Sequence, residues 1–317
     1  MKVSVVMATY NSLNYIGKQL DSIRNQSRKV DEVIFVDDCS KDETPNFLES
    51  YIKKYSLKNW KIYVNKENLG FINTFRTAIS KATGDIIILS DHDDIWLPNK
   101  CEIIVKAFND NRSILSLNTK FKKIDENDEL INIKESIFKS NNGLIRRRIK
   151  KGSLNKMSLK DTCIYNISPG CTCAISNELV KIYLRYSYDI PHDLELNILA
   201  ACYSGLYYLD IPTTLYRIYS GNTIGLNHQN KYEIRKKVVE HDLHEKELIA
   251  LLVGKNSRYI KDKRLIGRVE KIFKLRNSYF NTNKIKYLLL ALLNSINMNH
   301  LYESIIYDYL CVRRKKC

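Results

Sequence analysis

The 317-residue sequence has no long hydrophobic run, because its densest apolar segment, Tyr287–Leu293, is far shorter than the ~20 residues of a membrane-spanning helix. Only 11 residues are glycine and 5 are proline, and 44% are hydrophobic, which excludes collagen-like, fibrous and globally disordered chains. No segment with the features of a signal peptide precedes the first predicted strand. Eight cysteines are too sparse for a disulfide scaffold, and the close pair Cys171 and Cys173 lacks the spacing of a zinc site. We therefore expect a cytoplasmic protein with free thiols.

Positive charge is concentrated in the C-terminal third of the chain. The whole sequence has 51 Lys and Arg residues against 35 Asp and Glu, a net charge of +16. Residues 231–317 alone hold 20 basic and 9 acidic side chains interleaved with Leu, Ile and Tyr. This composition fits helices that lie on an anionic membrane surface, and it also fits a solvated helical face. No helix-turn-helix, zinc or RNP signature accompanies it, so we expect no nucleic-acid partner.

Strand and helix patterns alternate through about residue 108. Apolar runs predict buried strands at Val3–Met7, Val33–Val36 and Ile86–Leu89, and Trp60–Val64 is a further strand candidate. Apolar residues at helical spacing fill residues 13–23, 45–55 and 71–79 between them. This alternation predicts an α/β fold with a mostly parallel sheet flanked by helices, in which ligands bind beyond the carboxyl ends of the strands.

The domain organisation follows from the change in composition along the chain. We expect one α/β domain over residues 1–225, with the polar, Asn- and Lys-rich segment 109–160 as a mobile insertion over the site. Residues 226–317 are expected to form a basic helical region that attaches to a membrane or to a partner protein.

Carboxylates gather where two of the predicted strands end. Asp91, Asp93 and Asp94 directly follow one buried strand, and such closely spaced like charges require a cation or a set of hydrogen-bond donors. Oxygen ligands of this kind suit Mg²⁺ or Mn²⁺. Asp37 and Asp38 end another strand, where a carboxylate can accept hydrogen bonds from a base N–H or a ribose hydroxyl. In both places, capping of the following helix is the alternative explanation.

The order and spacing of these motifs resemble the family 2 glycosyltransferases. The resemblance rests on residues 4–11 (SVVMATYN), 36–40 (VDDCS), 68–70 (NLG), 84–85 (GD) and 91–94 (DHDD), and later on 170–172 (GCT), 191–193 (PHD) and 216–222 (YRIYSGN). The stretch SDHDDIW together with the His192-Asp193 pair most resembles the bacterial rhamnosyltransferase-like branch. The resemblance covers about residues 1–225.

The resemblance implies a GT-A fold, a nucleotide-diphosphate sugar donor and a divalent metal ion, Mn²⁺ or Mg²⁺. Carried over to this sequence, it assigns Asp193 as the general base and Asp91 and Asp93 as the metal-binding pair. The residues expected to bind the donor nucleotide are Ala8, Thr9, Tyr10, Asp37, Asp38, Asn68, Gly70, Arg76, Asp91, His92 and Arg217. His192 and Trp96 are expected to orient the base or to contact the acceptor.

Simpler explanations stay open for several of these residues. Asp193 opens a predicted helix and can serve as its N-cap, and His192 can be a cap or a surface residue. Trp96 suits packing, and Cys171 suits an apolar interior.

The chemistry of glycosyl transfer makes the same demands as the resemblance. Metal neutralises the charge that grows on a diphosphate leaving group, and a carboxylate takes the proton of the attacking hydroxyl. We therefore expect an inverting, metal-dependent glycosyltransferase that uses dTDP-rhamnose or a UDP-hexose. Its acceptor would be a cell-surface polysaccharide or a lipid-linked oligosaccharide at the cytosolic face of the membrane. The alternative is a non-catalytic nucleotide-sugar-binding or scaffold subunit of a glycan assembly complex.

Overall fold

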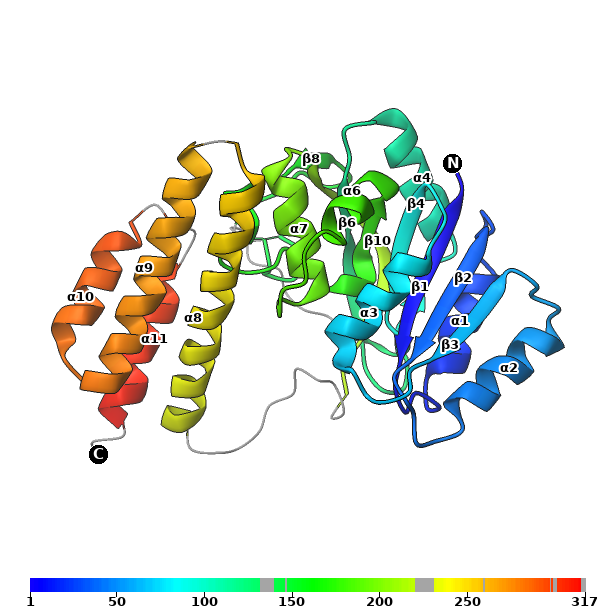
Figure 1. Ribbon diagram of the computed structural model, residues 1–317, viewed down its shortest axis with the longest axis horizontal. Coiled ribbons are helices and arrows are strands. Elements are labelled where there is room, and N and C mark those ends of the chain that lie inside the picture. Colours follow the sequence, from blue (N-terminus) through cyan, green and yellow to red (C-terminus); the bar gives the residue numbers. More distant parts are fainter. Residues whose placement is uncertain are drawn as a thin grey trace.

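The computed structural model describes residues 1–131, 140–145, 147–219, 231–258, 260–296, 298 and 301–314. A twisted sheet with helices on both faces forms one end of the molecule, and a bundle of C-terminal helices forms the other (Figure 1). In the described residues the sheet has ten strands, with the order β3-β2-β1-β4-β9-β6-β10-β5 and with β7 and β8 paired outside this path.

The first half of the sheet is parallel and confirms the sequence prediction. Its strands are β1 (Val3–Thr9), β2 (Glu32–Asp37), β3 (Trp60–Val64) and β4 (Ile86–Ser90). The connecting helices are α1 (Ile16–Arg24), α2 (Thr44–Lys54) and α3 (Gly70–Lys81). The register pairs Thr9 of β1 with Asp37 of β2 and Met7 with Ser90 of β4, so these strands end at one edge of the sheet.

The second half of the sheet is mixed: its longest ladder, between β6 and β10, is parallel, and short antiparallel ladders flank it. Here β9 (Cys173–Ser176) is antiparallel to both of its neighbours, β4 and β6 (Ser116–Ile124). The long strand β10 (Leu206–Arg217) runs parallel to β6 and antiparallel to β5 (Ile95–Trp96). The short strands β7 (Leu130–Ile131) and β8 (Leu154–Lys156) pair with β6 and β10.

The prediction that residues 109–160 form a mobile insertion is wrong for β6, which lies inside the sheet. Polar residues on this strand concealed it in the sequence, because their partners come from distant elements. Asn118 is fully buried and bonds to Asn197, and Thr119 is fully buried and bonds to Thr213. Residues 132–139 and 146 of the segment lie outside the described residues.

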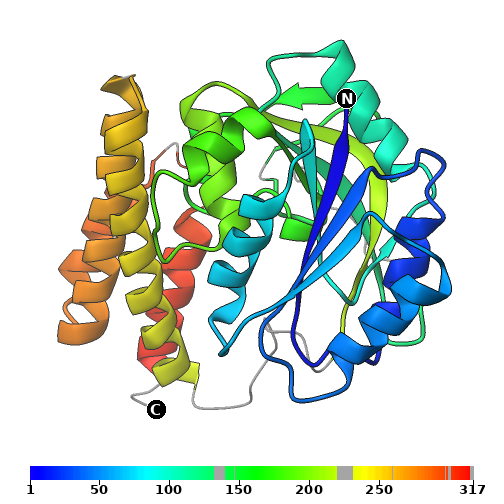
Figure 2. The ribbon, with the colours of Figure 1, turned by 45° about the vertical axis from the view of Figure 1, so that its right-hand side comes forward.

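Helices cover both faces of the sheet with separate apolar clusters (Figure 2). On one face, α1, α2 and α4 (Lys100–Asp110) pack against residues such as Val5, Met7 and Phe35. On the other face, α3, α6 (Asn177–Tyr183) and α7 (His192–Cys202) pack against Val6 and Leu89. The short α5 (Leu159–Thr162) and the 3₁₀ turn at Gly170–Thr172 connect β8 to β9.

The C-terminal region is helical, as the sequence predicts. It consists of α8 (Lys231–Asn256), α9 (Ile260–Thr282), α10 (Ile285–Asn294) and α11 (Leu301–Arg314). Its apolar core is continuous with the cluster around α7, so the bundle packs on the sheet domain. Residues 220–230 around the predicted boundary at residue 225 lie outside the described residues. A search of the described helices finds none that is long and apolar enough to cross a membrane.

Candidate active site

Hydrogen bonds tie together the ends of β1 and β2 on the predicted nucleoside side. The Thr9 hydroxyl donates to Oδ1 of Asp37 at 2.8 Å, and the Ser40 backbone N–H donates to its Oδ2 at 2.8 Å. Asp38 is also buried, and it accepts hydrogen bonds from the backbone N–H groups of Leu69 (2.8 Å) and Gly70 (2.9 Å). The two carboxylates thus shape the edge of the sheet from inside the protein.

The remaining predicted nucleoside contacts lie nearer the surface at this edge. Tyr10 and Asn68 are exposed, and Ala8 is half-buried at the end of β1. Gly70 begins α3 with φ of +77°, a left-handed conformation that favours glycine. Contact of these residues with a nucleotide stays a prediction.

Residues 91–94 directly follow β4 and are called the acidic turn below. Two of its carboxylates lie close to the thiol of Cys171. One ligand atom each of Asp91, Asp94 and Cys171 lies within 4.8 Å of the others. Burial, followed by the charges of Asp94 and Asp93, raises the pKa of Asp91 well above its usual value. Burial and the charge of Asp93 raise the pKa of Asp94 to about 7. A half-buried and a buried carboxylate that repel each other in this way fit a divalent cation.

The candidate metal-binding cluster shares only Asp91 with the pair that the sequence resemblance implies. Among the described residues, Asp91 lies with Asp94 and Cys171 rather than with Asp93. The oxygen ligands of Asp91 and Asp94 suit Mn²⁺ and Mg²⁺, whereas the Cys171 sulfur is a softer donor than these ions prefer. The pKa of the Cys171 thiol is raised by burial, so the thiol is neutral.

Lys100 lies beneath this cluster and was not identified from the sequence. Its side chain is fully buried, and Nζ donates to the Cys171 carbonyl at 2.6 Å and to the Thr214 hydroxyl at 2.9 Å. Burial lowers the pKa of Lys100 to about 8. The sequence offered one sign of a buried lysine: Lys100 lies on the same helix face as Cys101 and Ile104, which are apolar. A lysine on a buried face needs a polar partner inside the protein.

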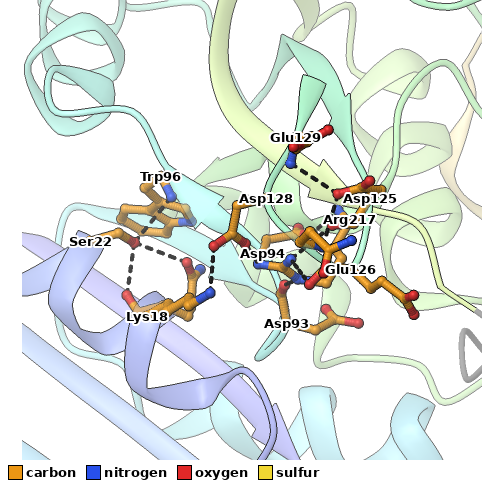
Figure 3. Close-up of polar contacts among 12 residues, drawn as sticks. Lys18, Ser22, Asp93, Asp94, Trp96, Asp125, Glu126, Asp128, Glu129 and Arg217 are labelled. Carbon is orange, nitrogen blue, oxygen red and sulfur yellow. Dashed lines mark hydrogen bonds and ion pairs between the residues drawn. The ribbon is translucent and has the colours of Figure 1, made fainter. Parts of the chain in front are cut away.

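Arg217, the last residue of β10, holds the acidic turn in place (Figure 3). Its backbone N–H donates to Oδ1 of Asp94 at 3.0 Å, and its Nε donates to the Asp93 carbonyl at 2.7 Å. The guanidinium is fully buried and forms an ion pair with Asp128 at 2.6 Å. The predicted contact of Arg217 with the donor is therefore corrected: this side chain positions the turn from within the protein.

Arg76 and Trp96 also require correction, because both face the interior. Arg76 forms an ion pair with the fully buried Glu195 at 2.7 Å and donates to the Tyr186 carbonyl at 2.6 Å, so it joins α3 to α7 instead of binding the donor. Trp96 is 2% exposed and packs in the core, with the Lys100 ammonium 4.1 Å from the ring centroid. An acceptor cannot reach this indole.

His92 occupies the variable position of the acidic turn and is half-buried. Burial lowers the pKa of its imidazole, which is therefore neutral at physiological pH. Its Nδ1 is buried, and among the described residues it has no hydrogen-bond partner. Contact of His92 with the donor stays a prediction.

The candidate base Asp193 lies in the first turn of α7. Its Oδ1 accepts a hydrogen bond from the Leu194 backbone N–H at 2.8 Å, and its Oδ2 accepts one from Asn166 Nδ2 at 2.8 Å. Burial raises the pKa of this carboxyl to about 6. A carboxylate with a pKa near neutrality is well suited to accept a proton from a hydroxyl group.

His192 is buried beside Asp193 rather than lying on the surface. Its ring stacks on Phe75 with centroids 3.9 Å apart, and burial lowers the pKa of the imidazole to about 3. Neither ring nitrogen has a hydrogen-bond partner among the described residues, so His192 does not orient the base through a hydrogen bond. Asn166, which the sequence did not reveal, makes that contact.

Comparisons of sequence agree with the motifs in this site. A profile of the family described as "Glycosyl transferase family 2" matches residues 4–171. An uncharacterized glycosyltransferase of Rickettsia typhi is 26% identical over 271 residues, covering 82% of this chain and 78% of that protein. One from Haemophilus influenzae is 36% identical over 126 residues, 40% of this chain and 38% of that protein. Matches to relatives from Rickettsia bellii and Nostoc span only 17% and 40% of those proteins.

Comparisons of structure confirm the GT-A fold. Staphylococcus aureus TarS in complex with UDP aligns with a TM-score of 0.60 at 20% identity, covering 98% of this chain and 88% of that one. The mannosyltransferase PcManGT from Pyrobaculum calidifontis, in complex with GDP-Man and Mn²⁺, aligns with a TM-score of 0.61 at 17% identity, covering 99% and 86%. The family profile covers more than half of the sequence and includes the acidic turn, so the chain belongs to glycosyl transferase family 2.

Proposed function

We propose that this protein is a metal-dependent, inverting glycosyltransferase that moves a sugar from a nucleotide-diphosphate sugar to a hydroxyl group of a glycan. The observation that carries the proposal is the pairing of two kinds of carboxylate at one site. The half-buried Asp91 and the buried Asp94 repel each other, and Asp193, whose charge acts on Asp91, is a separate carboxyl with a pKa of about 6. Asp91 and Asp94 are thus available to bind a cation, and Asp193 is available to accept a proton.

The proposed metal site consists of Asp91 and Asp94, with Asp93 next to them on the same turn. A bound Mn²⁺ or Mg²⁺ would supply positive charge to the diphosphate leaving group. Arg217 fixes the turn through the backbone of Asp93 and the carboxylate of Asp94, so the ligands are positioned before the ion arrives. The pair that the sequence resemblance implies, Asp91 and Asp93, is the alternative ligand set, and mutagenesis can distinguish the two.

The proposed reaction is a single displacement at the anomeric carbon. The acceptor oxygen attacks the anomeric carbon from the face opposite the diphosphate. The new C–O bond forms as the bond between the anomeric carbon and the diphosphate oxygen breaks, and the electron pair of that bond leaves with the diphosphate. Asp193 takes the proton of the acceptor hydroxyl. One attack from the opposite face inverts the anomeric configuration, and no covalent enzyme intermediate is needed.

The structural neighbours support a nucleotide-diphosphate sugar as donor. TarS structures contain UDP or UDP-GlcNAc, and the mannosyltransferase contains GDP-Man with Mn²⁺. We propose a UDP-hexose or dTDP-rhamnose, the second following from the resemblance to the rhamnosyltransferase-like branch. The proposed acceptor is a cell-surface polysaccharide or a lipid-linked oligosaccharide.

The outer face of α10 supports the proposal that the protein lies on a membrane surface, which we take to be the cytosolic one. Leu288 and Ala291 of α10 pack inward, yet a second apolar stripe faces solvent; it consists of Ile285, Leu289, Leu290 and Leu293, with Ile296 just after the helix. Lys284 and Lys286 are exposed next to this stripe, and residues 284–296 contain no acidic side chain. Figure 1 shows α10 on the outside of the bundle, away from the sheet. Apolar side chains flanked by lysine match an anionic lipid surface.

A panel of donors tests the proposed function. The full chain is incubated with UDP-, dTDP- and GDP-sugars, with and without Mn²⁺, and both the melting temperature and the release of nucleoside diphosphate are followed. We expect one nucleotide class to raise the melting temperature and to be turned over only with metal. Metal-dependent donor binding without turnover on any glycan acceptor would instead favour the alternative, a non-catalytic subunit. Absence of binding to every donor would contradict both.

A further inference from the structure

A chain of three asparagine side chains leads from the centre of the sheet to Asp193. Asn118 of β6 donates through Nδ2 to Oδ1 of Asn197 on α7 at 2.7 Å. Asn197 Nδ2 donates to Oδ1 of Asn166 at 2.9 Å, and Asn166 Nδ2 donates to Oδ2 of Asp193 at 2.8 Å. These hydrogen bonds connect β6, the loop that contains Asn166, and α7, through residues that are far apart in sequence.

The hydrogen bonds fix the direction in which each amide points. The Asn197 oxygen accepts from two donors, Asn118 and the Ser116 hydroxyl, the latter at 2.8 Å. The Asn166 oxygen likewise accepts from Asn197 and from the Ile167 backbone N–H at 2.9 Å. Reversing either amide would place donor against donor in a site where Asn118 and Asn197 are fully buried, and unsatisfied buried polar groups are costly. The Asn166 amino group is thereby held facing Asp193.

Both oxygens of Asp193 then have a fixed donor. Oδ2 is held by Asn166, and Oδ1 is held by the Leu194 backbone N–H at 2.8 Å. Each carboxylate oxygen has a second lone-pair direction, so a proton can still be accepted in the plane that these two bonds define. Orientation of this kind is worth a large factor in rate, because small misplacements of a reacting group are costly.

We propose that Asn118, Asn197 and Asn166 form a relay that positions the Asp193 carboxylate for proton transfer, with Asn166 as the residue in direct contact. The proposal rests on the proposed function only where it names Asp193 as the base. The relay gives a functional reason why β6 presents the polar side chains of Ser116 and Asn118 to α7, where apolar side chains would be usual.

Other titratable groups also face Asp193 and must be considered in any pH-dependent test. They are Asp91 on the acidic turn, Cys173 on β9, Tyr183 on α6, Glu245 on α8 and the neighbouring His192. The hydrogen bond from Asn166 lowers the pKa of Asp193 against the effect of burial. Loss of that bond therefore raises the pKa of Asp193.

The test compares Asn166→Ala with Asn177→Ala. Asn177 is a matched control, because it is also half-buried on the same side of the sheet and donates its amide to one carbonyl, that of Gly84, at 3.1 Å. In Asn166→Ala we expect kcat to fall by roughly tenfold to a hundredfold while the donor KM stays unchanged. We also expect the acid limb of the pH–rate profile to shift to higher pH. Asn177→Ala should leave all three unchanged. Asn166→Ser serves as a second variant if Asn166→Ala melts early.

A second readout separates this proposal from the assignment of the base. The carboxyl carbon of Asp193 is titrated by NMR in the full chain, with its signal identified by its absence in Asp193→Asn. A higher titration midpoint in Asn166→Ala than in the wild type supports the relay whether or not Asp193 is the base. An unchanged midpoint, or the same shift in Asn177→Ala, would overturn the relay. Full activity of Asp193→Asn would overturn the base assignment alone.

Discussion

Arg217 and Asp94 are 123 positions apart in sequence, yet the backbone N–H of Arg217 donates to the Asp94 carboxylate at 3.0 Å. The same arginine reaches the Asp93 carbonyl through Nε and the Asp128 carboxylate through its guanidinium. The end of β10 thus determines the shape of the acidic turn that follows β4 (Figure 3). The carboxylates proposed to bind the cation and the arginine that shapes their turn thus come from distant parts of the sequence.

Replacement of Arg217 tests this positioning role. Arg217→Ala is expected to lower the free energy of unfolding by about 3 kcal/mol, since it removes a fully buried guanidinium with its hydrogen bonds and its ion pair to the half-buried Asp128. It should also weaken Mn²⁺ binding, because the turn loses its anchor. Urea unfolding and metal titration measure the two effects. Lys106→Ala, which breaks the exposed pair with Asp110, is the control and should change stability by less than about 1 kcal/mol.

Replacement of Arg76 tests the correction of its role. Because Arg76 pairs with buried Glu195, Arg76→Met should lower the free energy of unfolding by about 3 kcal/mol while donor affinity changes less than about twofold. The double variant Arg76→Met/Glu195→Gln should recover part of the loss, since no buried charge is left unpaired. A large loss of donor affinity in a variant that still folds would restore Arg76 to the donor site.

Metal binding should depend on pH in a defined direction. The folded-state pKa of Asp94, about 7, is above its ordinary value of 3.8, so the metal-free protein loses stability as pH rises from about 4 to about 7. A cation offsets this loss above pH 7, whereas below it the cation must displace a proton. We expect Mn²⁺ to raise the melting temperature more at pH 8 than at pH 6. Equal shifts at both values would contradict the carboxylate site.

Attachment to lipid should depend on the outer stripe of α10. The variant Leu289→Glu/Leu293→Glu is expected to remain in the supernatant when the wild type sediments with vesicles of anionic phospholipid. Leu251→Glu on α8 is the matched control, because Leu251 is also exposed but stands outside this stripe. Unchanged sedimentation of the double variant, or equal sedimentation with neutral vesicles, would argue against the proposed membrane contact.

The sequence predicted those parts of the fold in which local pattern and tertiary environment agree. Strands β1, β2 and β4 are apolar because both faces of the sheet are covered there, so their apolar runs were visible in the sequence. Strand β6 was missed because Asn118 and Thr119 are satisfied by side chains from α7 and β10, which a local pattern does not reveal. A polar strand in a sheet interior looks like a loop until its partners are known.

In the candidate site, too, the sequence revealed residues that belong to a motif but not residues whose role depends on contacts with distant residues. The acidic turn and Asp193 were found from their motifs, since each follows a recognisable element. Lys100 and Asn166 were missed because their significance lies in contacts with Cys171 and Asp193, which are distant in sequence. The resemblance at residues 216–222 implied a donor contact for Arg217, whereas Asp128, between β6 and β7, pairs with its guanidinium inside the protein.

The pH dependence of turnover should report the ionisation of Asp193. With a pKa of about 6, the carboxylate is ionised and able to accept a proton above that pH, so the rate should fall tenfold per unit as the pH drops below about 6. The rate is measured with saturating donor and Mn²⁺ at or above pH 7 and then in steps downward, with recovery on return to pH 7 as the control for unfolding. A flat profile from pH 7 to 5 would show that another group takes the proton.

The most direct measurement compares Asp193→Asn with the wild type for both donor binding and sugar transfer. The account predicts that the variant binds the nucleotide sugar with metal as the wild type does, while kcat falls by about 10² or more. Full transfer activity in Asp193→Asn, with donor binding intact, would contradict the assignment of Asp193 as the general base.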